Sequence, residues 1–352
     1  MSLEPQLRAL RQSAALTSLD PVRLLRVSGP EAFELVDRLC PTPLFLRDGQ
    51  ARHSLLLDEG ARIVADLLIC RDDEDFLLLA EPTSPEALAA HLARHAPGDA
   101  GTRCGDVTSD FALLSLDGPY AWEVLAAVVG AEAVGLPYLS FFKTGTWTVL
   151  RSGKTGEYGY VLIVPREEGP QARARIAELG APFDLAFASL EALDHCALEN
   201  WFFNIRREGA EEGLTPLELQ LQWRVSYKKP YVGAEALQAR RATVAARTTC
   251  VLSASELRGG DEVRLGGERV GRVLHAVRSP WRNEHVGIAL LDRAYAHAGL
   301  DVFTAARGPE RTSLRTASAP VLDNASLYVH PQRHSYQTRQ ELKLPPLAPP
   351  LP

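Results

Sequence analysis

The stretch RLLRVSGPEAFELVDRLC, residues 23–40, sets a pattern that returns as FALLSLDGPYAWEVLAAVV at residues 111–129. Each copy has the features of a short β-strand, a Gly-Pro turn and an amphipathic helix. Proline stands where the helix starts, a place where its missing N–H costs nothing. In the first copy we expect the helix to run from Glu31 to about Leu39. A strand–turn–helix phrase that occurs twice favours two related α+β subdomains.

Further elements are expected around the two copies. Hydrophobic runs with charged or Gly-containing breaks predict strands, and SPEALAAHLARHA predicts a helix with Ser84 as its N-cap. From Thr248 onward, short runs separated by Gly-Gly turns predict a small antiparallel barrel. The resulting α+β organisation is a two-subdomain core at 1–240, a C-terminal antiparallel β-barrel at 245–325 and an extended proline-rich tail at 326–352.

The composition narrows the class of protein. Of the 352 residues, 46 % are hydrophobic and 23 % are charged, which is typical of a globular chain. The net charge of −6 and the lack of long Lys/Arg blocks argue against nucleic-acid binding. There is no apolar run long enough for a membrane span and no apolar leader. Five scattered cysteines without a C-x-x-C pattern indicate reduced thiols, so we expect a cytoplasmic protein that acts on a small molecule, with neither nucleic acid nor membrane as partner.

Two short motifs suggest ligands but fail on spacing. The letters GKT at 153–155 resemble a phosphate-binding loop, yet the glycine required five positions before Gly153 is replaced by Thr148. What remains is a glycine-rich turn between two β-rich runs, which is either a plain connection or the wall of a pocket. His91 and His95 have the spacing of zinc ligands on a helix, but no third ligand is evident, so we predict no metal site.

Several phrases then point to one family. They are VSGPEAF, LDGPYAWEVL, RSGKTGEYGY, CALE (Cys196–Glu199), TPLELQLQW and YVGAEAL. In this order and spacing they resemble the glycine-cleavage T-protein (aminomethyltransferase) family, which includes tetrahydrofolate-dependent demethylases and iron–sulfur assembly relatives. The resemblance covers about residues 13–322. It implies a two-lobed, folate-binding core and a C-terminal barrel around a central hole, with tetrahydrofolate as a possible cofactor.

The N-terminus departs from that family. T-proteins begin with a longer segment that carries an Asp-Phe-x-Gly-Trp motif, whereas only QSAALTSLD stands in this chain. The departure argues against a lipoyl carrier protein as partner.

The resemblance also assigns site residues. Asp66, in VADLL, corresponds to the aspartate that lies near the reacting folate nitrogens, and His53 replaces a tyrosine on the neighbouring strand. Glu81 replaces an asparagine, and Lys154 replaces a tyrosine of the glycine-rich turn. The glutamate that pairs with the pterin amino group is Val161, and the arginine that holds the folate tail is Leu193. Most of the family's pterin contacts are therefore expected to be lost.

The chemistry of these residues suggests a catalytic pair. Asp66 stands among apolar neighbours, so burial is expected to raise its pKa toward the range of a general acid or base. His53 is either within reach of Asp66, forming a proton-handling pair, or a half-exposed strand histidine. Lys154 either holds an anionic group of the substrate or faces solvent.

The remaining candidates for ligand contact are Glu157, Tyr158, Glu199 and Trp201, which join Glu81 and Lys154. Glu157 is also suited to cap the glycine-rich turn. Glu199 is either part of the pocket wall or, as we favour, a buried tie between its helix and a loop. The run NWFF, residues 200–203, is expected to fill space and reshape the pocket.

Three hypotheses of function follow. The first is transfer or removal of a one-carbon unit, methyl or aminomethyl, with a reduced folate bound in an altered pocket. The second is a folate-independent enzyme that uses Asp66 and His53 for elimination, cyclisation or hydrolysis. The third is a non-catalytic, folate-binding assembly protein like the iron–sulfur relatives. Against it, KKPYVGAEAL stands where those relatives have the signature K-G-C-Y-x-G-Q-E.

Overall fold

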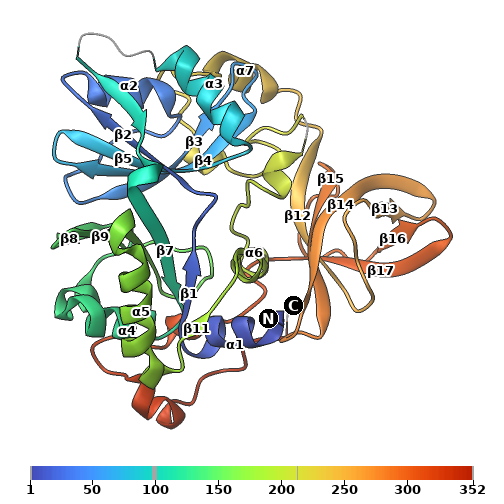
Figure 1. Cartoon of the computed structure of the whole chain (residues 1–352). Coiled ribbons are helices and arrows are strands. Elements are labelled where there is room, and N and C mark those ends of the chain that lie inside the picture. The colour runs from blue at the N-terminus through green and yellow to red at the C-terminus, as the bar shows by residue number, and fades with distance from the viewer. Residues whose placement is uncertain (1, 97–100, 212, 351–352) are drawn as a thin grey trace.

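The computed structural model describes residues 2–96, 101–211 and 213–350. Figure 1 shows two lobes built on β-sheets and a third lobe that is a β-barrel, with helix α6 (Leu190–Glu199) at their junction. The α+β fold expected from the sequence, with a C-terminal antiparallel barrel, is confirmed.

The first lobe is a five-stranded antiparallel sheet in the order β3-β4-β5-β2-β6. Its strands are β2 (Arg23–Ser28), β3 (Ala51–Leu57), β4 (Ile63–Asp72), β5 (Asp75–Pro82) and β6 (Arg103–Asp106). Helices α2 (Ala32–Leu39) and α3 (Pro85–His95) pack against it, and the Ser84 side chain accepts the N-cap hydrogen bond of α3 from the Ala87 N–H.

The second lobe is a six-stranded sheet in the order β11-β1-β7-β10-β9-β8. Its strands are β1 (Ala15–Ser18), β7 (Phe111–Asp117), β8 (Phe141–Thr144), β9 (Trp147–Leu150), β10 (Gly159–Pro165) and β11 (Ala186–Phe187), covered by α4 (Ala121–Val129) and α5 (Gly169–Gly180). Strand β1 pairs antiparallel with β7 and parallel with β11. The start of the chain therefore belongs to the second lobe, not to the first.

The two copies of the repeated phrase form equivalent structures. In each, a strand meets a helix through a glycine with positive φ, +112° at Gly29 and +135° at Gly118. A Cβ atom would lie 2.5 Å from the Gly101 carbonyl oxygen at the first position and 2.6 Å from the Ser13 carbonyl oxygen at the second. Backbone conformation and close packing thus both require glycine.

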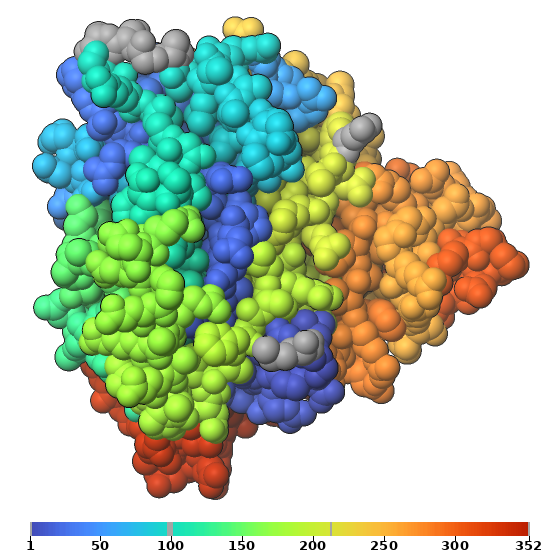
Figure 2. Space-filling view, in the orientation of Figure 1, coloured from blue at the N-terminus to red at the C-terminus, as the bar shows by residue number. Residues whose placement is uncertain are grey.

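The third lobe is a closed barrel, so its strands leave no unpaired sheet edge. Its strands are β12 (Ala246–Ser253), β13 (Glu262–Leu265), β14 (Glu268–Ser279), β15 (Glu284–Asp292), β16 (Phe303–Arg307) and β17 (Glu310–Ala317). The segment between α6 and α7 (Ala234–Arg240) contributes to a hydrophobic cluster shared by the first lobe and the barrel. Figure 2 shows this yellow-green segment along the junction between the lobes and the barrel.

The N-terminal helix and the segment after the barrel are joined near α6. Helix α1 (Leu3–Gln12) lies against α6, and its Arg11 donates a hydrogen bond to Asn324. After the barrel the chain forms two short 3-10 helices, Ala325–Leu327 and Tyr336–Glu341, and buries Val329 in the core of the second lobe. Residues 351–352 of the predicted tail lie outside the described residues. In the described part of the chain, no helix has the length and apolar character of a membrane span.

Candidate functional site

The candidate functional site contains two carboxylates that strand pairing places side by side. Asp66 on β4 lies directly opposite Glu81 on β5, and like charges in such a position repel one another. Lys154, from the glycine-rich turn after β9, lies between them. Its Nζ donates to Asp66 Oδ2 at 2.8 Å and to Glu81 Oε1 at 2.7 Å. The lysine therefore compensates a repulsion that the strand register creates.

The ion pairs continue on both sides of this lysine. Arg224 Nη1 donates to Asp66 Oδ1 at 2.5 Å. Arg206 donates to Glu81 Oε2 at 2.9 Å and to Asp194 on α6. We call the six residues the charge chain. In order they are Arg224, Asp66, Lys154, Glu81, Arg206 and Asp194, with alternating sign and no net charge.

The charge chain overturns the expected pKa of Asp66. Burial alone would raise that pKa, but the nearby charges of Lys154 and Arg224 outweigh burial and hold it well below its usual range. Asp66 is therefore an ionised carboxylate at neutral pH. The prediction that it would be tuned as a general acid or base was wrong, because sequence does not reveal which cations fold onto a carboxylate.

The Lys154 ammonium is directed at the two carboxylates, and the side chain is 27 % exposed. Burial would lower its pKa, but Asp66 and Glu81 raise it above its ordinary value, so the ammonium stays charged. Asp66 and Glu81 accept two of the three hydrogen bonds that the ammonium can donate. The lysine is therefore held in place by the two carboxylates.

Two cavities meet at this place. The charged cavity is lined by most of the charge chain, by His53 and by apolar side chains that include Leu68, Leu79, Val161 and Leu193. The aromatic cavity lies between the core and the barrel. It is lined by His53, by Glu208 and Arg224, and by the aromatic residues Tyr138, Trp201, Phe202, Phe203 and Trp223. His53 lines both cavities.

His53 faces the same side of the sheet as Asp66, because Leu55, two residues further along β3, lies directly opposite Asp66. Its Nε2 lies 3.3 Å from the Tyr138 hydroxyl. No hydrogen bond joins His53 to Asp66 in the part of the chain that the structure describes. Burial and the positive charge of Arg224 lower the pKa of His53 to about 4. The imidazole is therefore neutral at pH 7.

We expect an NMR titration to show His53 neutral at pH 6 and protonated only near pH 4. His53 is half-buried, and its pKa in the folded protein lies below the value of about 6.5 that a histidine has in an unfolded chain. The unfolded chain therefore binds the proton first, and the folded state loses stability as the pH falls from about 6.5 toward 4. A His53→Gln variant identifies the signal. Protonation near pH 6.5 would show that the cavity is open to water and would contradict this prediction.

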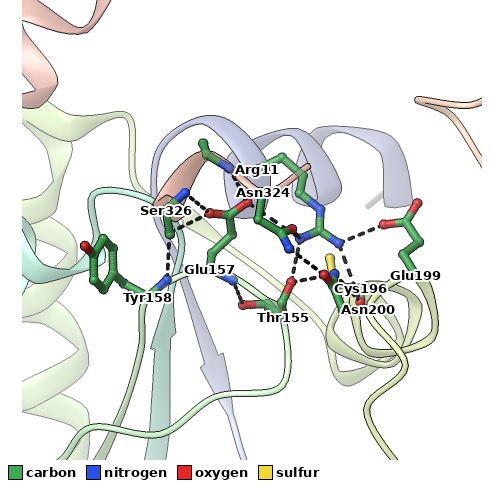
Figure 3. Close-up of polar contacts among 10 residues, drawn as sticks. Arg11, Thr155, Glu157, Tyr158, Cys196, Glu199, Asn200, Asn324 and Ser326 are labelled. Carbon is green, nitrogen blue, oxygen red and sulfur yellow. Dashed lines mark hydrogen bonds and ion pairs between the residues drawn. The ribbon is translucent and has the colours of Figure 1, made fainter. Parts of the chain in front are cut away.

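Glu157 and Glu199 lie in a separate buried network around Arg11 of α1 (Figure 3). Arg11 donates to Glu199 Oε2 at 2.8 Å, and Nη1 lies 3.7 Å from Glu157 Oε1. Ser279 of the barrel donates to Glu199 Oε1 at 2.6 Å, and Ser326 donates its hydroxyl to Glu157 at 2.5 Å. All three charged side chains are fully buried. The favoured interpretation of Glu199 as a buried tie agrees with this geometry.

The same network holds the glycine-rich turn and the segment after the barrel. Arg11 also donates to the Thr155 carbonyl at 2.5 Å and to Asn324 Oδ1 at 3.0 Å. The Tyr158 N–H donates to Ser326 Oγ, and its hydroxyl donates to the Val329 carbonyl. The structure does not bring Glu157, Tyr158 or Glu199 to either cavity. It does bring together Asp66, His53, Glu81 and Lys154, with Trp201 in the adjoining aromatic cavity.

Sequence reasoning missed Arg224, Arg206, Asp194 and Glu208. None of them belongs to a motif with its own spacing, and each reaches the cavities from a different part of the segment 194–224. The one signal was the concentration of charged residues in NIRREGAEE, residues 204–212, shortly after α6 ends at Glu199.

Within the described residues, no group of three His, Cys, Asp or Glu side chains could hold a metal ion. Of the two histidines with zinc-like spacing, His91 is buried, and His95 Nε2 lies 3.2 Å from Glu59 Oε1.

Comparison with known proteins identifies the class to which this fold and site belong. Residues 2–229 match the model of the GCVT N-terminal domain, and residues 247–323 match that of the glycine cleavage T-protein C-terminal barrel domain. The chain therefore belongs to the glycine-cleavage T-protein family, as its motifs indicated.

Its relatives are distant but similar over most of their length. An aminomethyltransferase of Rubrobacter xylanophilus is 32 % identical over 292 residues, which cover 80 % of this chain and 77 % of the relative. One from a Thermotoga species (strain RQ2) is 27 % identical, with 83 % and 82 % covered. The crystal structure of the glycine cleavage system aminomethyltransferase T from Bartonella henselae has a TM-score of 0.82 at 25 % identity, with 90 % and 88 % covered.

Proposed function

We propose that this protein is an enzyme that transfers or removes a one-carbon unit, methyl or aminomethyl, of a small metabolite, with a reduced folate bound in an altered way. The observation that carries the proposal is Asp66. It is a buried, ionised carboxylate in a cavity that the charge chain and apolar side chains line together, at the position that the resemblance assigns beside the reacting folate nitrogens.

The residues of the two cavities fit a folate ring, but with a changed set of contacts. The apolar side chains of the charged cavity can cover a flat ring. Val161 offers no acceptor to the ring N–H groups, and burying such donors without partners costs about 1–3 kcal/mol. Glu208 of the adjoining aromatic cavity retains a buried oxygen, Oε2, without a hydrogen-bond partner among the described residues. An acceptor is thus present, although not at the family's position.

The reduced folate would supply the ring nitrogens that accept the one-carbon unit. The contribution of the protein is electrostatic: the charge of Asp66 stabilises positive charge that develops on the reacting group. Lys154 and Arg224 hold one oxygen each, so the carboxylate is fixed before reaction and need not reorganise. The low pKa of Asp66 means that it does not act as the proton donor at neutral pH.

A folate-independent enzyme is the second candidate, and the charge chain favours it. Cations and carboxylates alternate along the cavity wall, so the wall offers partners to both ends of a zwitterionic metabolite. His53, neutral near pH 7, would then be the group able to accept a proton. Leu193, where the resemblance implies an arginine for the folate tail, fits this alternative equally well.

The experiment that separates the two candidates is an anaerobic calorimetric titration with tetrahydrofolate and 5-methyltetrahydrofolate. We expect a dissociation constant in the micromolar range, which corresponds to about −8 kcal/mol. Glycine and a dimethylated glycine serve as zwitterionic comparison ligands without a ring. No detectable heat with millimolar folate would overturn the proposal, and binding of the amino acids alone would favour the second candidate.

A further inference from the structure

One carboxyl group in the two cavities is left without a full set of partners by the protein itself. Glu208 is only 4 % exposed and lines the aromatic cavity. Its Oε1 accepts a hydrogen bond from the Asn204 N–H at 2.7 Å, whereas Oε2 has no partner among the described residues. A buried polar atom without a partner is costly in a folded protein and needs an explanation.

The other carboxylates near the cavities are already occupied or covered. Asp66 and Glu81 accept from cations of the charge chain on both oxygens. Asp117 also retains an oxygen without a partner, Oδ1. However, a Cβ at Gly153 or Gly159 would lie 2.7 Å from that oxygen, so the backbone of the glycine-rich turn packs over it. Glu208 is therefore the carboxyl best placed to accept new hydrogen bonds from a ligand, whereas Asp66 acts through its charge.

The rest of the aromatic cavity suits a flat ring. Trp201 and Gln220, which both line it, have φ angles of +63° and +58°. For a residue as large as tryptophan this conformation is strained, and such strain gathers at binding sites. Trp223 is 65 % exposed, and its ring centroid lies 4.7 Å from Arg224 Cζ. An exposed indole at the edge of an aromatic cavity can stack on an incoming ring.

We propose that Glu208 is a ligand-binding residue that accepts hydrogen bonds from a flat, amino-substituted nitrogen heterocycle, such as the aminopyrimidine half of a pterin, in the aromatic cavity. The inference rests on the proposed function and deepens it, because Glu208 offers, from the adjoining aromatic cavity, an acceptor for ring N–H groups that Val161 of the charged cavity lacks. A carboxylate and two adjacent N–H donors form a bidentate, charge-assisted pair. Burial raises the pKa of Glu208 to about 7. At neutral pH the carboxyl is therefore near its pKa, and hydrogen bonds from N–H donors of a ligand would favour its ionised form.

The test compares Glu208→Gln with Glu211→Gln, a matched change on the same loop. Glu211 pairs with Arg272 and does not line the cavity. Tetrahydrofolate binding is followed by calorimetry and by tryptophan fluorescence. We expect Glu208→Gln to weaken binding at least tenfold, as loss of a charged hydrogen bond requires, and Glu211→Gln to change it less than twofold. Equal affinity in all three proteins would overturn the role of Glu208 and leave the proposed function intact.

Two further arms cover the other outcomes. If the wild type does not bind folate, the proposed function fails, and 2,4-diaminopyrimidine is then titrated as a smaller probe. Binding of this probe that is lost in Glu208→Gln supports the inference without folate, and no binding overturns it. If Glu208→Gln proves unfolded, Trp223→Ala replaces it, because an exposed side chain can be removed without loss of the core. Unchanged ring affinity in Trp223→Ala would then count against the site.

Discussion

An Arg11→Met variant is expected to unfold with a free energy about 3–5 kcal/mol below that of the wild type, because it leaves buried charges without their partner. Arg11 is 2 % exposed and lies against two fully buried carboxylates, Glu157 and Glu199. Methionine retains most of the volume, so the effect reports the lost charge and hydrogen bonds, not a cavity. The free energy of unfolding of a single domain seldom exceeds about 15 kcal/mol, so a loss of this size is large.

The measurement is denaturant unfolding followed by circular dichroism. Arg8→Met is the control, because Arg8 is on the same helix but its ion pair with Glu4 is exposed. Exposed pairs of this spacing contribute about 0.5 kcal/mol, so the control should unfold almost as the wild type does. If both variants lost the same small amount of free energy of unfolding, the network around Arg11 would not be what holds α1 to the segment after the barrel.

Much of the fold could be predicted from local patterns. The repeated strand–turn–helix phrase, the N-cap at Ser84 and the Gly-Gly turns of the barrel each express their structure within about twenty residues. The network around Arg11 cannot be predicted from any such local pattern. It joins α1, the glycine-rich turn, α6 and the segment after the barrel, which are separated by up to 313 positions along the chain. No periodicity in the sequence connects such distant segments.

The candidate site also has a part that the sequence predicts and a part that it does not. Asp66 was found because it stands in a recognisable phrase, and its burial follows from its apolar neighbours. Its protonation state was predicted wrongly, because that depends on Arg224, 158 positions away, and on the direction in which Lys154 points. Charge pairing of this kind is decided by tertiary packing. Glu208 was missed because an unsatisfied oxygen can be recognised only once every neighbour is placed.

The second large effect is expected for Asp66→Asn, which should slow folate-dependent transfer by about 100-fold or more. Asparagine keeps the shape of the side chain and one acceptor, but it removes the negative charge that we assign to stabilising the reacting group. Because the effect is on charge that develops during reaction, the dissociation constant of tetrahydrofolate should change far less than the rate. Single-turnover rates at saturating folate, with the methylated or aminomethylated donor that the wild type converts, measure it.

The control must separate loss of this particular charge from loss of any ion pair. Asp37→Asn serves, because Asp37 pairs with Lys229 at 2.5 Å and lines neither cavity. Thermal unfolding of both variants is needed as well, since Asp66→Asn leaves Lys154 and Arg224 with a weaker partner. If a folded Asp66→Asn protein lost folate affinity by the same factor as rate, Asp66 would be a ligand contact with no separate effect on the reaction. If it kept at least a third of the rate, the electrostatic role would be wrong, and His53 would become the residue to test next.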